Sequence, residues 1–227
     1  MILSVHVAKA AGNSFRELLK AKFGERMMGD YGDWAGFDTP EANQRRSSRT
    51  AAMRSRAAEL VEKYDVIHGH FQADKYLDLF PRADYIAFFR DPYQQSVAHY
   101  YFLLRNPQRE HPEERIFHEA KMTLHDYLEW DAFRNHQSQY LGTIPIDAFA
   151  MVGLSEQFGS SIARFSSIFG YQLGEERFAN VNPDRELSGY PIDADVRRAV
   201  NKYRAADIEL YRRAQEIFAK QAALEPA

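Results

Sequence analysis

Short apolar runs alternate with longer amphipathic stretches along the chain. Four of these runs are short and mainly apolar, and each is followed by a turn or a polar cluster. This pattern is typical of strands in a parallel sheet that is covered on both faces. We therefore predict strands over residues 3–7, 66–68, 85–89 and 149–152.

The stretches between these runs carry helical periodicity or helix-end signals. Thr39-Pro40 suits the start of a helix, and Gly170 suits the end of one. The predicted helices cover residues 14–22, 40–64, 93–105, 154–169 and 194–223. Strands that alternate with helices predict a single three-layer α/β domain over residues 1–227, with a central parallel sheet flanked by helices. Ligands of such domains bind at the carboxyl ends of the strands.

Composition narrows the functional classes. The chain has 227 residues, 45% of them hydrophobic, a net charge of -3 and no cysteine. This charge gives no global attraction for nucleic acid or anionic membranes, so we expect no nucleic-acid partner. Without cysteine, a disulfide framework, thiolate zinc ligands and a cysteine nucleophile are excluded. We see no targeting segment and no apolar run near the ~20 residues of a membrane helix, which favours a cytoplasmic location.

The first predicted strand leads into a loop of small residues that contains a lysine and opens a helix. Small residues let the backbone approach a ligand, and the helix N-terminus favours an anion. The loop differs from the nucleotide-triphosphatase motif, because Lys9 precedes Gly12 instead of following it. An ordinary turn with a surface lysine is the alternative. The candidate phosphate-binding residues are Lys9, Ala10, Ala11, Gly12, Asn13, Ser14 and Phe15.

A second candidate anion site follows the third predicted strand, where Arg90-Asp91-Pro92 opens a helix. An arginine at the exit of a buried strand is costly unless it meets an anion or a carboxylate. The alternative is a local ion pair with Asp91. Two anion sites at neighbouring strand ends suggest one ligand that carries two phosphate groups.

The second predicted strand ends in His68-Gly69-His70. A histidine at a strand end can accept a proton from a bound hydroxyl near neutral pH. Two other fates stay open for this pair. Both rings are candidate metal ligands, although no third ligand of clear spacing lies nearby, and a structural histidine that hydrogen-bonds a loop is common.

Two segments resemble those of a known enzyme family. Residues 6–14 resemble the 5′-phosphosulfate loop of sulfotransferases that use 3′-phosphoadenosine 5′-phosphosulfate (PAPS). Arg90-Asp91-Pro92, followed by a helix with Tyr100-Tyr101, resembles their 3′-phosphate segment. The resemblance is closest to the carbohydrate sulfotransferases that modify polysaccharides, including the uronyl 2-O-sulfotransferases, which carry His-Gly-His between these segments.

This resemblance implies a three-layer P-loop-like fold and a metal-free reaction with PAPS as cosubstrate and adenosine 3′,5′-bisphosphate as product. His70 matches the histidine regarded as the catalytic base in the family, with His68 in support. Lys9 and the loop would stabilise the departing phosphate. The acceptor is expected to be a hydroxyl on a carbohydrate.

The sequence departs from the family pattern at three positions. Ala8 replaces the usual proline, and Asn13 replaces threonine but keeps a hydrogen-bond donor. The serine expected beside the arginine aligns with Ala98, so Ser96 is our candidate for the 3′-phosphate. Arg185, in a segment that resembles the loop closing over the nucleotide, is a further candidate.

A basic run in the middle of the chain is a candidate for recognising the acceptor. A basic run could recognise a polyanionic glycan, but a solvated helix face paired with nearby glutamates is the favoured alternative. Three other functions stay open: sulfation of a small metabolite or lipid, a non-catalytic nucleotide- or glycan-binding module, and a phosphotransferase that uses ATP or GTP. The basic run comprises Arg45, Arg46, Arg49, Arg54 and Arg56.

Overall fold

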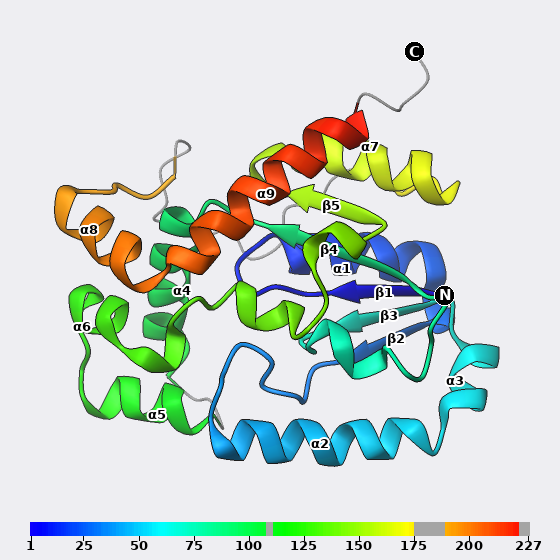
Figure 1. The fold of residues 1–227 in the computed structure, drawn as a ribbon, viewed down its shortest axis with the longest axis horizontal. Coiled ribbons are helices and arrows are strands. Elements are labelled where there is room, and N and C mark those ends of the chain that lie inside the picture. The colour runs from blue at the N-terminus through cyan, green and yellow to red at the C-terminus, as the bar shows by residue number, and fades with distance from the viewer. Residues whose placement is uncertain (108–110, 175–188, 223–227) are drawn as a thin grey trace.

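The computed structural model describes residues 1–107, 111–174 and 189–222. In this part of the chain, five parallel strands form one sheet in the order β2-β3-β1-β4-β5 (Figure 1). The strands are β1 (Ile2–Val5), β2 (Met27–Asp30), β3 (Val66–Gly69), β4 (Asp84–Phe89) and β5 (Met151–Leu154). The predicted three-layer α/β architecture with a central parallel sheet is confirmed.

Four of these strands match the predicted apolar runs to within two residues at each end. The fifth, β2, was not predicted. It lies at the edge of the sheet, pairs only with β3, and has just two apolar residues, Met27 and Met28. A half-exposed edge strand this short has no continuous apolar run that could reveal it.

Helices lie near the predicted ranges, but the one expected from residue 154 begins at Phe158, and two helices over residues 112–119 and 124–129 were not predicted. The helix expected over residues 40–64 is interrupted at Ser55 and Arg56, and the one expected over 194–223 is interrupted at Arg204. Neither break has a glycine or proline beside it, so no helix-stop signal marks it in the sequence. The helices are α1 (Gly12–Phe23), α2 (Pro40–Arg54), α3 (Ala57–Lys63), α4 (Pro92–Arg105), α5 (Pro112–Glu119), α6 (Leu124–Glu129), α7 (Phe158–Phe169), α8 (Ala194–Tyr203) and α9 (Ala205–Ala222).

Each face of the sheet is covered by its own core. Helices α1 and α7 cover one face, where Phe15 and Phe165 meet the strand residues Ile86 and Phe88. The opposite face packs against α9 and α3, with Leu60 among its buried residues. Alternation along each strand therefore places apolar side chains on both faces.

A third buried cluster lies beyond the carboxyl ends of the strands. Helices α4, α5, α6 and α8 gather there, on the side toward which the strand arrows of Figure 1 point. Its centre is aromatic, with Phe117, Tyr127 and Phe133 all fully buried. The helices of this cluster therefore cover one side of the strand ends. Across the described ranges, every helix is too short or too polar to cross a bilayer.

The basic run is turned partly toward the protein and partly toward solvent, where Arg45, Arg54 and Arg56 are exposed. Arg49 bonds Asp30 and Asp33 at 2.8 and 2.5 Å, and Arg46 bonds the carbonyl of Phe37 at 2.8 Å. Arg56 pairs with Glu59, as the solvated-face alternative expected. Arg46 and Arg49 therefore fasten α2 to β2 and to the chain that follows it.

The buried carboxylates under this helix give a stability prediction. Lys75 lies 2.7 Å from Asp33 and also contacts Asp30, and all three side chains are at most 3% exposed. Lys75→Met removes a buried cation from two buried carboxylates that Arg49 and the Tyr76 hydroxyl only partly compensate, so we expect unfolding to become easier by about 3–5 kcal/mol. Urea denaturation measures this loss. Lys20→Met, at an exposed position on α1, is the matched control, and an equal small loss in both variants would contradict the prediction.

Candidate functional site

The sheet order brings the three predicted site segments together. Strand β1 lies between β3 and β4, so the loop after β1 is flanked by the ends of both neighbours. In register, Val5 pairs with Gly69 on one side and with Ala87 on the other. The carboxyl ends of these three strands therefore form one edge, where an α/β fold binds its ligands.

The loop after β1 has an unusual backbone. Lys9 and Ala11 both have positive φ, at 61° and 66°, in the left-handed region that non-glycine residues seldom adopt. Ala11 is the N-cap of α1 and provides no side-chain bond to the first turn. The first N–H groups of a helix have no partner within it. Such an uncapped helix start after a strained loop suits anion binding.

Three carbonyl groups of this loop are held by side chains from neighbouring elements. His70 Nδ1 lies 2.6 Å from the carbonyl oxygen of His6, and Gln95 Nε2 donates to that of Ala8 at 3.0 Å. Arg90 Nη1 donates to the carbonyl oxygen of Lys9 at 3.2 Å. The loop is thus fixed from β3 and from both ends of the β4–α4 turn, and Lys9, His70 and Arg90 share one edge.

The bond to His6 fixes the tautomer of His70. A carbonyl oxygen can only accept, so the proton of a neutral His70 ring sits on Nδ1 and the lone pair sits on Nε2. The hydroxyl of Tyr140 is 3.4 Å from the same Nδ1. A ring oriented in this way has the electronic form that a general base requires.

His6 was not predicted as part of the site, yet it is central to it. Its ring stacks on His70 with centroids 4.1 Å apart and on His68 at 5.1 Å. A side chain at Gly12 would begin only 1.9 Å from the His6 ring, so glycine is required there. Burial, and then the charges of His70 and His68, hold the pKa of His6 well below its usual value.

His68, predicted to support the base, lies deeper than His70. It is 1% exposed, and its Nδ1 is 2.8 Å from the Ser4 hydroxyl. Burial, with a smaller effect of His70, lowers the pKa of His68 to about 3. Burial has the same effect on His136, whose pKa is also lowered to about 3. Both rings are therefore neutral in the folded protein at physiological pH.

These buried rings predict a loss of stability in acid. The unfolded chain protonates its histidines near pH 6.5, whereas the folded protein keeps His68 and His136 neutral to about pH 3. The unfolded state binds more protons in this window, so the unfolding free energy falls by about 1.4 kcal/mol per pH unit for each ring. Urea denaturation at pH 7, 6, 5 and 4 measures the slope.

The variant His68→Asn tests the source of this slope, because asparagine can still bond Ser4 but does not titrate. We expect its stability to depend less steeply on pH than that of the wild type. His125→Asn, at a surface position with 64% side-chain exposure, is the control. A wild-type stability that stays constant from pH 7 to pH 4 would contradict the assignment of neutral buried rings.

The other predicted loop residues occupy different depths. Asn13 is partly exposed, and Ser14 is buried in the first turn of α1. Phe15 packs in the core against Phe88 at 4.8 Å, and its N–H bonds the carbonyl of Ala11. It therefore supports the loop from beneath, and its side chain does not line the strand-end edge. Lys9 Nζ lies over the Phe102 ring at 4.4 Å.

The predicted 3′-phosphate residues are placed as follows. Arg90 is partly buried and contacts the loop as described. Ser96 is 1% exposed, and within the described residues its hydroxyl oxygen has no hydrogen-bond partner. Ala98, at the position where serine was expected, is buried as well. Arg185 lies outside the described residues.

Sequence reasoning also missed Gln95 and Gln137. Gln95 reaches the carbonyl of Ala8 from α4, and its amide nitrogen is 3.4 Å from His136 Nδ1. Gln137 forms hydrogen bonds with the main-chain N–H and carbonyl of Arg90. Neither belongs to a recognisable motif, and only the tertiary structure brings them to the site.

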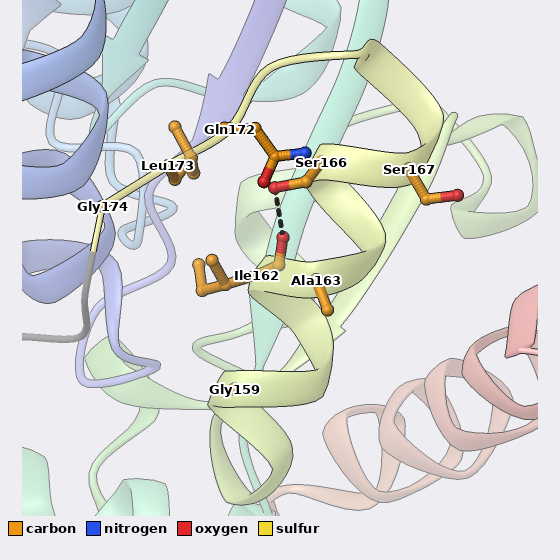
Figure 2. Close-up of a pocket in the computed structure, with 8 residues that line it drawn as sticks. All are labelled: Gly159, Ile162, Ala163, Ser166, Ser167, Gln172, Leu173 and Gly174. Carbon is orange, nitrogen blue, oxygen red and sulfur yellow. Dashed lines mark hydrogen bonds between the residues drawn. The ribbon is translucent and has the colours of Figure 1, made fainter.

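A pocket of about 490 Å³ lies elsewhere, along α7 (Figure 2). Small, apolar and amide side chains line it, and Ser166 turns its hydroxyl back to the Ile162 carbonyl at 3.2 Å. None of the predicted site residues lines it, and no ionisable side chain does. It offers no group for acid–base or phosphate chemistry. Among the described side chains, no three of His, Cys, Asp or Glu are grouped to hold a metal ion.

Comparisons with known proteins support the fold. No protein-family model matches the chain, and no curated protein is significantly similar to it in sequence. Among solved structures, the chain is similar to a sulfotransferase from Alicyclobacillus acidocaldarius, with a TM-score of 0.51 and 16% identity over 96% of this chain and 95% of that one. A sugar kinase from Janibacter sp. HTCC2649 has a TM-score of 0.40 and 13% identity, over 74% and 93% of the two chains.

The similarity to the sulfotransferase spans nearly the full length of both chains. A TM-score of 0.40 does not establish a shared fold with the kinase. The chain therefore has the three-layer α/β fold of a sulfotransferase.

Proposed function

We propose that this protein transfers the sulfuryl group of PAPS to an acceptor hydroxyl, with a carbohydrate as the expected acceptor. One observation carries the proposal. The loop after β1 is bonded on one side to His70 and on the other to Arg90, at 2.6 and 3.2 Å. A candidate base and two candidate phosphate-binding turns thus lie within a single strand-end edge.

The 5′ end of the nucleotide is assigned to the loop. The uncapped first turn of α1 would donate N–H groups to the phosphosulfate, and Asn13 and Ser14 add polar side chains. Lys9 would supply a positive charge that balances the negative charge growing on the departing phosphate. The loop adopts this conformation with positive φ at Lys9 and Ala11, which is energetically unfavourable for residues other than glycine.

The 3′-phosphate is assigned to Arg90. Its guanidinium uses one nitrogen for the Lys9 carbonyl, and a guanidinium has further donors suited to phosphate oxygens. Ser96 is the supporting candidate, because a buried hydroxyl without a partner is costly unless a ligand or water satisfies it. Arg185 stays a candidate from the sequence alone.

The chemistry is an in-line displacement at sulfur. The acceptor oxygen forms a bond to sulfur as the bond between sulfur and the bridging phosphate oxygen breaks, which releases adenosine 3′,5′-bisphosphate. His70 takes the acceptor proton on Nε2, while Nδ1–H holds the ring against the His6 carbonyl. The electron pair of the broken bond stays on the phosphate, beside the loop.

Tyr31 supports a ring-shaped acceptor such as a sugar. Its ring is 37% exposed and stands edge-on to His70, with centroids 5.1 Å apart. Arg16 lies over the Tyr31 ring at 5.9 Å. Aromatic faces suit the apolar faces of sugars, so this ring would orient an acceptor hydroxyl toward His70.

Incubation with sulfur-labelled PAPS and a panel of carbohydrate, small-metabolite and lipid acceptors tests the proposal. We expect label in a carbohydrate product together with release of adenosine 3′,5′-bisphosphate, and thermal stabilisation by that product. Label in a metabolite or lipid would change the acceptor class. Nucleotide binding without transfer to any acceptor would favour a non-catalytic module, and turnover of ATP with magnesium in place of PAPS would contradict the proposal.

A further inference from the structure

The side chain of Gln137 hydrogen-bonds both the N–H and the carbonyl of Arg90. Gln137 accepts a hydrogen bond from the Arg90 N–H at 3.0 Å through Oε1 and donates to the Arg90 carbonyl at 2.8 Å through Nε2. Arg90 is the first residue after β4, whose last ladder pair joins Phe89 to Leu154. The amide of Gln137 therefore supplies the pair of hydrogen bonds that a neighbouring strand would supply, at the residue where the pairing of β4 with β5 ends.

Gln137 is itself anchored to the first turn of α9. It is 1% exposed, and its own N–H donates to Asp207 on α9 at 3.1 Å. Asp207 also accepts from the N–H and the hydroxyl of Ser138, at 2.8 and 2.6 Å. Three donors on one buried carboxylate leave the 137–138 segment little freedom to move.

We propose that Gln137 is a positioning residue for nucleotide binding: it fixes the main chain of Arg90 so that the guanidinium points at the loop and at the 3′-phosphate. This inference rests on the proposed function. A long side chain loses conformational entropy when it binds a ligand. A fixed main chain at Arg90 lowers this entropy cost, because the guanidinium has fewer positions available before the phosphate binds. Gln137 touches Arg90 but has no assigned contact with the nucleotide, so its effect should depend on Arg90.

Calorimetric titration with two nucleotides tests this dependence. Gln137→Met removes both bonds at similar side-chain length. We expect it to weaken binding of adenosine 3′,5′-bisphosphate by about tenfold, and binding of adenosine 5′-monophosphate by less than about twofold. Because both ligands are measured on the same protein, a partly unfolded sample changes the apparent stoichiometry for both and leaves the ratio of affinities intact.

Two further variants sharpen the test. Gln137→Glu keeps the shape but places a carboxylate oxygen against the Arg90 carbonyl in a buried position, so we expect a loss at least as large as in Gln137→Met. In an Arg90→Ala background, Gln137→Met should change affinity by less than about twofold, since coupled residues are not additive. Gln139→Met, in the short helix (Ser138–Leu141) whose N-cap is Gln137, is the control and should bind both nucleotides like the wild type.

The outcomes separate the two proposals. If the wild type prefers the bisphosphate and Gln137→Met keeps the full preference, or loses affinity for both nucleotides equally, the role of Gln137 is wrong while the proposed function stands. A wild type that binds neither nucleotide overturns the proposed function and this role together.

Discussion

Replacing His70 with alanine should lower the rate of sulfuryl transfer by about 10²–10⁴, the usual contribution of a general base. The reason is that the N-bound proton of the neutral His70 ring is on Nδ1. Nδ1 is bonded to the His6 carbonyl at 2.6 Å, which leaves Nε2 as the atom that accepts the acceptor proton. Single-turnover transfer from labelled PAPS measures the chemical step separately from product release.

Alanine also removes the bond to His6, so a second variant is needed to separate the base from the anchor. His70→Asn can place an amide N–H on the His6 carbonyl but has no basic nitrogen. We expect it to bind adenosine 3′,5′-bisphosphate within about twofold of the wild type and to lose turnover as the alanine variant does. Near-normal transfer by His70→Asn would remove His70 from the role of base.

Replacing Arg90 with alanine should have the largest effect on nucleotide affinity. Hydrogen bonds from a charged donor contribute about 1.5–3 kcal/mol, which corresponds to a loss of roughly 10- to 150-fold for adenosine 3′,5′-bisphosphate. The same change should scarcely affect adenosine 5′-monophosphate, which has no 3′-phosphate. Calorimetric titration of both ligands measures the difference.

Arg90→Lys is the matched variant for this prediction. Lysine keeps the charge but lacks the planar fork that can hold the Lys9 carbonyl and a phosphate oxygen together, so we expect an intermediate affinity. If Arg90→Ala binds the bisphosphate as tightly as the wild type, the assignment of the 3′-phosphate is wrong, whatever the variant does to turnover.

Much of the fold could be predicted because the central strands are simple. Strands β1, β3 and β4 are buried on both faces, so each leaves a short apolar run with a polar cluster behind it. Edge strand β2 left no such run. The helix breaks at Ser55 and Arg204 were hidden as well, since no glycine or proline lies beside either of them.

The candidate site was predictable only in part, for a related reason. Lys9, His70 and Arg90 each follow a predicted strand, so the rule that ligands bind at strand ends selects them from the sequence. The residues that hold them do not follow any strand. His6 stacks on His70 because β1 and β3 are neighbours, and Gln137 reaches Arg90 from 47 positions away. Such contacts depend on the strand order, which a single sequence does not specify.

A crystal structure of the protein with adenosine 3′,5′-bisphosphate tests the central claim most directly. We predict one nucleotide spanning the ends of β1 and β4, with its 5′-phosphate on the first turn of α1 and its 3′-phosphate within hydrogen-bond distance of Arg90. His70 should face the open end of the 5′-phosphate. A nucleotide bound elsewhere, or bound at this edge with Arg90 turned away from the 3′-phosphate, would contradict the account.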